Sequence, residues 1–474
     1  SGLITVGPAG EDHFVVLSST DPITVGAQRL LQVRLEDQYN NVISGVNVTF
    51  NTIQGNGYFI TPGNGDTVVT TNANGIAEAL YTASSSTASG SDQIQVSYNA
   101  VNTTIEMTLQ AGAISYYEFA PSGDQNTTAG TGVAFTLTAR DAFGNAVANT
   151  QSVNLSTPGS STASFNVTSP VAFGGNSSVN FTVTDTVVGS FTVRAVNTTN
   201  SSVKGESGLI TVGVGPINYV LIRSEARNGG NEVGNLTLST DDRYTFYAAG
   251  YDQFGNYIDD VNVNWSTTGD LESVTLSNAN KFTFNPTLAG VSGTVRADHA
   301  TAGFDETGTI TITTGALARL RIQSNDQANG PEVNDSTLTA NQTLVLYAVG
   351  YDADGNYLGA TSANWSLNGL SGSLTPVNPT SQVTFDPQNT GSGSIRATAN
   401  ADPSVLDNTG TITVTPGAIS YVIIRSEPNG TGQDVGAVNL TVGQTLTLYA
   451  AGYDSKNNFS ANANVNWSTT GTLS

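Results

Sequence analysis

The chemical pattern that recurs most regularly in this chain is Asn-x-Ser/Thr, the acceptor sequence for an N-linked sugar. It stands at related positions in five places: Asn47, Asn154, Asn264, Asn364 and Asn466. Apolar residues alternate with the asparagine, as Val263 and Trp265 do around Asn264, so a strand would bury them and turn the asparagine outward. Two interpretations stay open: exposed N-glycosylation sites, or polar outward positions that composition and duplication turn into this pattern.

An Asp-led turn precedes each of these strands and offers carboxylate and amide oxygens. In Asp352-Ala-Asp354-Gly-Asn356 the oxygen-bearing residues alternate, as at the start of a calcium-binding loop. The other four turns carry a residue that is not a calcium ligand at the middle position: Tyr39, Phe143, Phe254 and Lys456. The pattern favours a hairpin turn whose aspartate accepts backbone N–H bonds and whose Gly or Asn tolerates positive φ, with Asp352, Asp354 and Asn356 as a calcium alternative.

Residues for enzymatic catalysis are scarce. The two histidines, His13 and His299, fall in different parts of the chain, and there is no cysteine. No histidine has a recurring serine or carboxylate partner, so we find no arrangement of nucleophile and base. We predict that the chain is not an enzyme and has no catalytic residues or cofactor, with N-linked glycans and calcium as possible additions.

Charge argues against further classes of partner. Lys and Arg total 15 against 37 Asp and Glu, so the net charge at pH 7 is −22. Without a basic patch to neutralise phosphates, nucleic acid and anionic membrane surfaces are poor partners. No stretch approaches 18 apolar residues, so we expect no direct membrane insertion in this segment. The absence of cysteine excludes disulfides from the fold.

The elements that must position these residues repeat roughly every hundred residues. Each repeat begins where a Thr-rich strand, a joint of a few residues and a new apolar strand follow one another, at Gly10, Gly112, Gly215, Gly315 and Gly417. Such short joints restrict bending. The repeats predict four domains over residues 8–112, 113–214, 215–315 and 316–417, an incomplete fifth over 418–474, and a closing strand of a preceding domain over 1–7.

Alternation with a period of two predicts the strands inside each repeat. Positions two, four and six before the turn aspartate are apolar or small; Leu35, Val33 and Leu31, for example, precede Asp37. The strand after the turn carries a tryptophan in the last three repeats, at positions 265, 365 and 467, which we expect to pack between two sheets. With no apolar pattern of period 3.6, short strands and turns predict an all-β chain of two-sheet antiparallel sandwiches.

Several segments carry a family resemblance. The first repeat contains Leu35-Glu-Asp-Gln-Tyr-Asn-Asn-Val-Ile-Ser-Gly-Val-Asn-Val-Thr-Phe50 and Thr70-Thr-Asn-Ala-Asn-Gly-Ile-Ala-Glu-Ala-Leu80, the second contains Ala139-Arg-Asp-Ala-Phe-Gly-Asn-Ala-Val147, and the last three share Gly-Tyr-Asp and Asn-Trp-Ser. These repeats resemble bacterial immunoglobulin-like domains, the tandem units of invasin- and intimin-type adhesins and many prokaryotic surface proteins. The resemblance implies tandem immunoglobulin-like antiparallel β-sandwiches joined by very short linkers, and a prokaryotic source.

These patterns together predict an extracellular structural repeat array. It would form part of a surface layer, sheath, filament or stalk of a larger cell-surface protein and associate with its own copies or other surface proteins. Two alternatives stay open. The chain is an adhesin for a ligand on a host or neighbouring cell, in which case an exposed aromatic patch such as Tyr116-Tyr117 is expected. Otherwise its units are spacers in a secreted enzyme.

Both ends of the repeat pattern are incomplete. Residues 1–7 match residues 207–213 letter for letter, and the repeat after Gly417 stops near Leu473. We expect the chain to be a window on a longer array. The alternative is that a neighbouring copy donates its leading strand, although seven residues do not replace the roughly forty that are missing.

Overall fold

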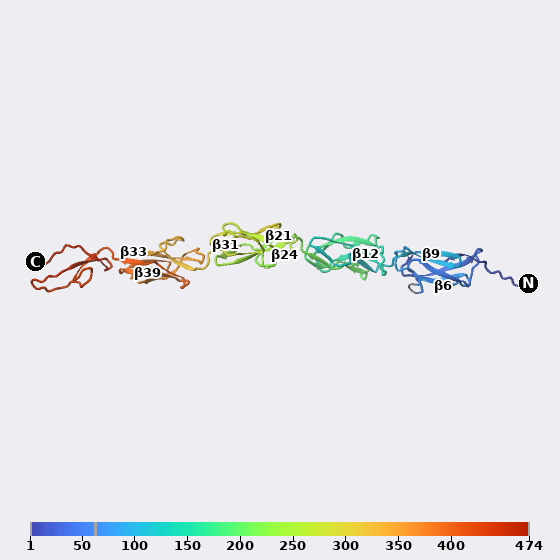
Figure 1. Ribbon diagram of the computed structural model, residues 1–474, viewed down its shortest axis with the longest axis horizontal. Helices are drawn as coiled ribbons and strands as arrows, with labels where there is room; N and C mark the ends of the chain where they lie inside the picture. The colour runs from blue at the N-terminus through green and yellow to red at the C-terminus, as the bar shows by residue number, and fades with distance from the viewer. Residues whose placement is uncertain (1, 61–63, 473–474) are drawn as a thin grey trace. The chain divides into compact units, whose positions relative to one another are not determined.

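The structure is a computed structural model that describes residues 2–60 and 64–472. All regular secondary structure in these residues is β-strand, and they contain no helix (Figure 1). The all-β fold class predicted from alternation is therefore confirmed. Within the same residues there is accordingly no helix long and apolar enough to cross a membrane. Four hydrophobic cores lie within residues 14–109, 117–212, 220–312 and 320–414.

The chain divides into two compact units, residues 1–216 with 252–258, and residues 217–251 with 259–474. Each of the four cores lies inside one of the predicted domain ranges. In the first unit, residues 111–115 separate the last strand of one sandwich from the first strand of the next. Residues 314–318 and 416–420 do the same in the second unit. Residue 1 of the predicted closing strand and residues 473–474 of the predicted fifth domain lie outside the described residues.

Two sheets enclose the first core. The strand order in one sheet is β1 (Glu11–Val16), β3 (Gln28–Asp37), β7 (Ile76–Thr82) and β5 (Tyr58–Phe59). The order in the other is β2 (Ile23–Thr24), β9 (Val101–Gln110), β8 (Ser91–Tyr98), β4 (Asn47–Gln54) and β6 (Asp66–Thr70). Leu31, Val33 and Leu35 of β3 are fully buried, as their spacing predicts.

The second sandwich has the same plan. One sheet contains β10 (Tyr116–Ala120), β12 (Val133–Arg140), β16 (Ser178–Thr184) and β14 (Ser164–Phe165). Facing it are β11 (Gln125–Thr128), β20 (Ile210–Gly213) and β17 (Gly189–Phe191), and the group β15 (Val171–Ala172), β13 (Ser152–Ser156), β18 (Arg194–Asn197) and β19 (Lys204–Glu206). Phe135, Leu137 and Ala139 of β12 face the core.

The second unit begins with the third core. Around β23 (Tyr244–Tyr251) lie β21 (Tyr219–Arg223), β24 (Tyr257–Asp260) and β27 (Lys281–Phe284). The opposite side has β22 (Leu236–Ser239), β31 (Ile310–Thr313) and β28 (Ser292–Gly293), and the group β26 (Thr275–Ala279), β25 (Val263–Thr267), β29 (Val295–His299) and β30 (Gly303–Glu306).

The fourth core repeats this plan with longer strands. One sheet contains β32 (Arg319–Gln323), β34 (Leu344–Tyr351), β38 (Gln382–Pro387) and β37 (Gly372–Thr375), with β35 (Tyr357–Ala360) beside β34. The other contains β33 (Ser336–Thr339), β41 (Ile412–Thr415), β39 (Gly391–Ala399) and β36 (Ala363–Asn368), with β40 (Leu406–Asn408) beside β39. After it, β42 (Tyr421–Arg425), β43 (Tyr449–Tyr453) and β44 (Phe459–Asn462) form a single sheet.

The tryptophans show where two sheets are present. Trp265 and Trp365 are 1% and 4% exposed, and their indole N–H groups donate to the carbonyls of Ala279 and Thr380, both at 2.9 Å. Trp467 is 52% exposed. The predicted burial is therefore confirmed for Trp265 and Trp365. The third differs because the strands described after residue 417 form one sheet, with no second layer to cover the ring.

One strand pair in each complete sandwich runs parallel, which the sequence patterns did not predict. The four pairs are β2 with β9, β11 with β20, β22 with β31 and β33 with β41. In each case the chain leaves the first sheet after one strand and joins the opposite sheet beside the last strand. The other strand pairs of known register in the described part of these sandwiches are antiparallel, so the predicted sandwich class stands with this addition.

Residues 2–7 form no strand in the structure. Leu3, Ile4 and Val6 are 95%, 87% and 88% exposed. The identical residues in β20 behave differently: Ile210 and Val212 are 0% and 1% exposed because β11 and β17 flank that strand. The same sequence therefore forms a strand only where neighbouring strands pair with it.

Candidate functional site

Each Asp-led turn holds its aspartate in a recurring cradle of hydrogen bonds. In the second sandwich, Asp141 Oδ1 accepts the backbone N–H groups of Phe143 (2.9 Å) and Asn145 (2.8 Å). Its Oδ2 accepts the N–H of Gly112 at 2.9 Å and the Nδ2 of Asn145 at 3.0 Å. Asp141 is 1% exposed. Gly112 lies in the short connection before the sandwich, and we call each such connection a seam. The carboxylate therefore ties the seam to the turn.

The same cradle forms at the other four turns, around Asp37, Asp252, Asp352 and Asp454. Their seam donors are Ala9, Gly215, Gly315 and Gly417, at 2.8 to 3.1 Å. The residue three positions after the aspartate has positive φ in every case: Asn40, Gly144, Gly255, Gly355 and Asn457. The predicted turn chemistry is therefore confirmed, because only Gly and Asn adopt this conformation readily.

The asparagine four residues after the aspartate makes a contact that the sequence did not predict. Asn145 donates its Nδ2 to the carbonyl of Ser85 at 2.8 Å, and its Oδ1 accepts the N–H of Thr87 at 3.0 Å. Both partners belong to the preceding sandwich of the same unit. We call this pair of bonds the Asn clasp. It uses both ends of the amide and satisfies two backbone groups in a loop between strands.

Three further turns make the same clasp, each inside one unit. In the first unit Asn256 bonds the carbonyl of Thr186 (2.8 Å) and the N–H of Val188 (3.3 Å). In the second unit Asn356 bonds Thr287 and Ala289 (2.9 and 3.0 Å), and Asn458 bonds Gln388 and Thr390 (3.1 and 3.2 Å). The receiving loop is always a carbonyl and the N–H two residues later. The carbonyls, at positions 85, 186, 287 and 388, are spaced 101 residues apart.

A signal for the clasp was present in the sequence. The third position after the aspartate, which requires positive φ, is either Gly or Asn. The fourth position is Asn in all five turns: Asn41, Asn145, Asn256, Asn356 and Asn458. A turn needs no asparagine there for its backbone. The constant amide therefore indicated a side-chain role, but its partner lies about 60 to 70 residues away in the chain, as the separations of 60 and 70 at Asn145 and Asn458 show, and no local pattern reveals it.

The middle residue of the turn differs from joint to joint. The ring of Phe143 lies over Gly26, where an added Cβ would come within 2.6 Å of the ring, so only glycine fits. Lys456 instead forms an ion pair with Asp386 at 3.0 Å. In both cases the partner belongs to the preceding sandwich. The clasp is thus constant, while the contact beside it is specific to each joint.

The cradle lowers the pKa of the aspartates. Burial alone raises the pKa of Asp352, but hydrogen bonds from Asn356, from Thr240 and from the backbone outweigh it and hold that pKa at about 2. The Thr240 hydroxyl, which belongs to the preceding sandwich, donates at 2.8 Å. The pKa of Asp37 is also about 2, where hydrogen bonds with Asn41 and with backbone N–H groups overcome burial. Each carboxylate is therefore held in its charged, accepting form at neutral pH.

The calcium alternative at Asp352, Asp354 and Asn356 requires side-chain oxygens, and in this turn hydrogen bonds occupy those of Asp352 and Asn356. The structure places all three residues in one turn, but the oxygens of Asp352 accept five hydrogen bonds. The Asn356 oxygen accepts the N–H of Ala289. A cation would have to displace these donors. In the residues that the structure describes, no group of three or more His, Cys, Asp or Glu side chains could hold a metal ion.

The predicted acceptor asparagines lie on the surface. Asn47, Asn154, Asn264 and Asn364 are exposed within β4, β13, β25 and β36, and the neighbours on either side are buried except Val46, which is half-buried. In the second to fourth sandwiches the register matches as well: the residue after the asparagine faces Ala195, Ala297 or Ala397 on the next strand. Asn466 is exposed too, but it lies outside any strand.

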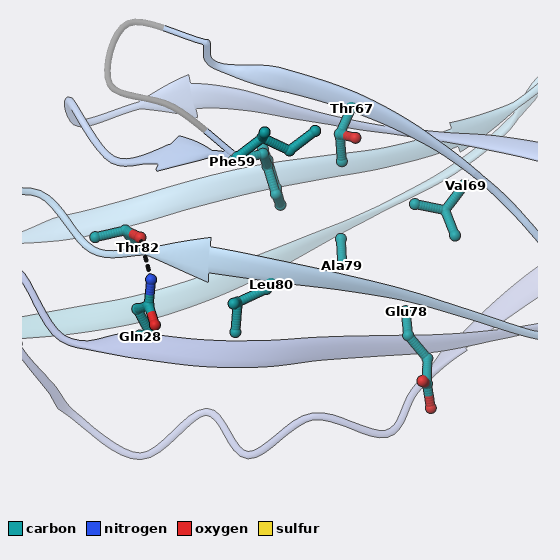
Figure 2. Close-up of a pocket in the computed structure, with 9 residues that line it drawn as sticks. Gln28, Phe59, Thr67, Val69, Glu78, Ala79, Leu80 and Thr82 are labelled. Carbon is teal, nitrogen blue, oxygen red and sulfur yellow. Dashed lines mark hydrogen bonds between the residues drawn. The ribbon is translucent and has the colours of Figure 1, made fainter.

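The first sandwich has a surface hollow of about 310 Å³, which is large enough to be considered as an enzyme site. Figure 2 shows Phe59, Thr67, Val69, Ala79 and Leu80 around it, with a hydrogen bond of 3.3 Å from Gln28 to Thr82 at one side. Among the described residues of its lining, Glu78 is the one titratable group, and its carboxylate accepts a bond from Gln32. None of these residues is a nucleophile with a base beside it.

The other residues considered for chemistry are held locally. His13 lies 3.2 Å from Asp12 and 3.5 Å from Glu36 in the first unit, whereas His299 bonds the N–H groups of Thr301 and Ala302 in the second. Of the aromatic pair Tyr116-Tyr117, Tyr116 is 37% exposed. Tyr117 is buried at 3%, and its hydroxyl accepts the Nδ2 of Asn197 at 2.8 Å. The pair therefore does not form an exposed aromatic patch.

No protein-family model matches the chain, and no curated protein matches it either. Among solved structures, the chain is similar to invasin, a bacterial integrin-binding protein, with a TM-score of 0.35, 15% identity, and coverage of 85% of this chain and 79% of that one. The Escherichia coli adhesin FdeC gives a TM-score of 0.35, 16% identity, and coverage of 65% and 100%. Domains 4–9 of the surface-layer protein SbsC give a TM-score of 0.22 and 14% identity, with coverage of 96% of this chain and 81% of that one.

The similarity extends to proteins of other kinds and concerns the fold alone. Protocadherin gammaB7, for example, has a TM-score of 0.34 and 11% identity, with coverage of 84% of this chain. The order of the strands is more informative. In the described residues, one sheet of each complete sandwich has four or five strands, and in the facing sheet the strand that crosses over from the first sheet pairs with the last strand. Two packed sheets with this connection are the arrangement of an immunoglobulin-like sandwich. The chain is a tandem array of immunoglobulin-like β-sandwiches, as the resemblance seen in its sequence implies.

Substitution of Asn356 by alanine should loosen the joint between the third and fourth sandwiches. It removes two hydrogen bonds between them and one to Asp352, each worth about 1 kcal/mol. Because the chain lacks cysteine, spin labels can be attached to cysteines introduced at the exposed positions Thr275 and Val377. Pulsed electron spin resonance should give one narrow distance distribution for the unaltered joint and a broader one for Asn356→Ala.

Asn41→Ala is the matched control for this experiment. Asn41 makes the same bond to its own aspartate, Asp37, but it is exposed and bonds no loop of another sandwich within the described residues. The label distances should not change in this variant. An equally narrow distribution in Asn356→Ala and in the unaltered chain would show that the clasp does not hold the joint.

The joints should weaken in acid. Since the folded-state pKa of Asp352 is lower than the ordinary value of about 3.9, its contribution to stability is fully present above that value and is lost as the pH falls towards 2. The pKa of Asp141, Asp252 and Asp454 is lowered for the same reason, after the opposing effect of burial. Calorimetry between pH 7 and pH 2 should show constant unfolding temperatures down to about pH 5 and a decline below pH 4. Temperatures that stay level to pH 2 would contradict this assignment.

Proposed function

We propose that the chain is a structural array of the cell surface, forming part of a surface layer, sheath, filament or stalk. The observation that carries the proposal is the Asn clasp. It ties one sandwich to the next inside each unit through backbone groups, across connections of only a few residues. A protein that works by holding modules in a fixed relation needs such joints, whereas a flexible tether does not.

Composition supports the same proposal. The described residues contain many exposed Asn, Ser and Thr side chains and no cysteine, and a net charge of −22 keeps the surface soluble. The bacterial surface proteins among the structurally similar chains share the fold, which is compatible with this role. Association with copies of the same chain, or with other surface proteins, is part of the proposal.

Electron cryo-tomography of native cells, with gold-labelled antibodies raised against the chain, tests this function. We expect the label on the outer surface, in a lattice, a filament or a layer of stalks whose internal repeat follows the repeat of the sandwiches. Label confined to the cell interior would contradict the proposal. Label found only on a secreted complex with enzymatic activity would favour the spacer alternative.

We also propose that the exposed acceptor asparagines carry N-linked glycans. In the modification, the Nδ2 of the asparagine forms a bond to the anomeric carbon of a lipid-linked saccharide, the bond from that carbon to the diphosphate breaks, and the amide proton is released. Asn154, Asn264 and Asn364 present their amides on one register position of three sandwiches. A sugar there points to solvent and leaves the core intact; the same holds for Asn47 and Asn466.

Mass spectrometry of peptides from the native protein should find a saccharide mass on Asn154, Asn264 and Asn364. Asn197 is an internal control because it has the same acceptor pattern but is 3% exposed, with its amide bonded to Tyr117 and Gln151. A glycan on Asn197 is incompatible with the folded sandwich. Peptides from native material that carry only unmodified asparagine at the three exposed sites would refute the proposal.

A further inference from the structure

In each complete sandwich, the parallel pair joins the second strand, close to where the chain enters, to the last strand, from which the chain leaves. In the second sandwich, β11 and β20 pair over four residues, from Gln125 with Ile210 to Thr128 with Gly213. Flanking bonds extend the ladder: the N–H of Gln125 donates to the carbonyl of Leu209 at 2.8 Å, and that of Ala129 to Gly213 at 2.9 Å. The pairs β22 with β31 and β33 with β41 also span four residues each.

This arrangement determines how tension along the chain acts on a sandwich. Tension enters before the first strand of the pair and leaves after the last strand. Because the two strands run parallel, these two points lie at opposite ends of the ladder. The strands are therefore pulled past each other, and all the hydrogen bonds between them carry the load together. In a pair loaded at one end, by contrast, the bonds would break one at a time.

A side chain caps the ladder in three sandwiches. Asp124 Oδ1 accepts the N–H of Leu209 at 2.9 Å, just before β11 and β20 begin to pair. Asn235 does the same for Thr309 at 2.9 Å, and Asp335 for Thr411 at 2.7 Å. The cap lies at the end where tension enters. It adds one bond that must break with the ladder, and for the two aspartates the acceptor is charged and correspondingly stronger.

The first sandwich has a shorter ladder. β2 and β9 pair only through Ile23 with Leu109 and Thr24 with Gln110, and Val25 adds one bond to Gln110 at 3.0 Å. The residue before β2 is Pro22, where the other sandwiches have Asp or Asn. Within the described residues of this sandwich, no carboxylate or amide side chain caps the N–H at the start of the pair.

We propose that the side-chain caps and longer ladders make the second, third and fourth sandwiches resist tension more strongly than the first, and that among the four complete sandwiches the first yields first. The inference deepens the proposed surface function, on which it rests for the source of the force. The chain would then resist pulling with three strong modules and lengthen by releasing one weak module. The property is mechanical and can be measured on the isolated chain, whatever tomography shows about its location.

Single-molecule pulling of the full chain by its two ends is the test. We expect three unfolding events at similar high force and one complete sandwich that unfolds at clearly lower force. Cysteines at Thr49 and Ser97, which face each other across β4 and β8, identify the first sandwich. In a chain without other cysteines their disulfide shortens that sandwich's extension, and a reductant restores it.

Asp335→Ala tests the clamp itself. Loss of one hydrogen bond to a charged acceptor should raise the unfolding rate of the fourth sandwich at constant force about tenfold. Asp402→Ala is the matched control, because Asp402 lies in an exposed turn of the same sandwich and its carboxylate accepts bonds from Ser404 alone among the described residues. Asp335→Asn should largely restore the rate, since Asn235 serves as the cap in the third sandwich.

Calorimetry of each variant first establishes that all four complete sandwiches are folded. If Asp335→Ala does not fold, the force ranking of the unaltered chain, with the first sandwich marked by its disulfide, still decides the question. A first sandwich that resists force as well as the others would overturn the inference. So would a folded Asp335→Ala chain that unfolds at the same rate as Asp402→Ala.

Discussion

The constraint on which this structure depends is the hydrogen bonding of the backbone where one sandwich ends and the next begins. A few residues connect two sheets there, and the N–H groups of Gly112, Gly315 and Gly417 among them have no partner in either ladder and need another acceptor. One aspartate and one asparagine meet this need. The aspartate accepts the seam N–H together with the N–H groups of its own turn, and the asparagine bonds a carbonyl and an N–H of the preceding loop. Both side chains belong to a turn of five residues, so one short motif fixes the joint.

The fold was largely predictable because its cause is local. Burial alternates along β3 and β12 as the apolar residues do, and the turn glycines and asparagines adopt the positive φ that their types suggest. The outward direction of Asn154, Asn264 and Asn364 followed from the same alternation. Each of these properties depends on residues a few positions apart, and such patterns are visible in a single sequence.

The joint and the ladder were not predictable because they join residues far apart. Asn145 meets Ser85 across 60 residues, and Gln125 pairs with Ile210 across 85. The sequence marked these positions by constancy, with Asn in every turn and Asp or Asn before three of the crossing strands, but gave no partner. Position 467 is instructive too. Its neighbours match those of Trp265, yet the ring is exposed because no second sheet covers it.

Hydrogen–deuterium exchange of the intact chain tests the clasp most directly. The N–H groups of Thr87, Ala289 and Thr390 belong to loop residues that are half-buried or exposed, so without the clasp they would exchange about as fast as other loop amides. As donors to Asn145, Asn356 and Asn458 they should exchange much more slowly than the amides beside them. Slow exchange at all three would support the account of the joints, and exchange at the rate of an open loop would contradict it.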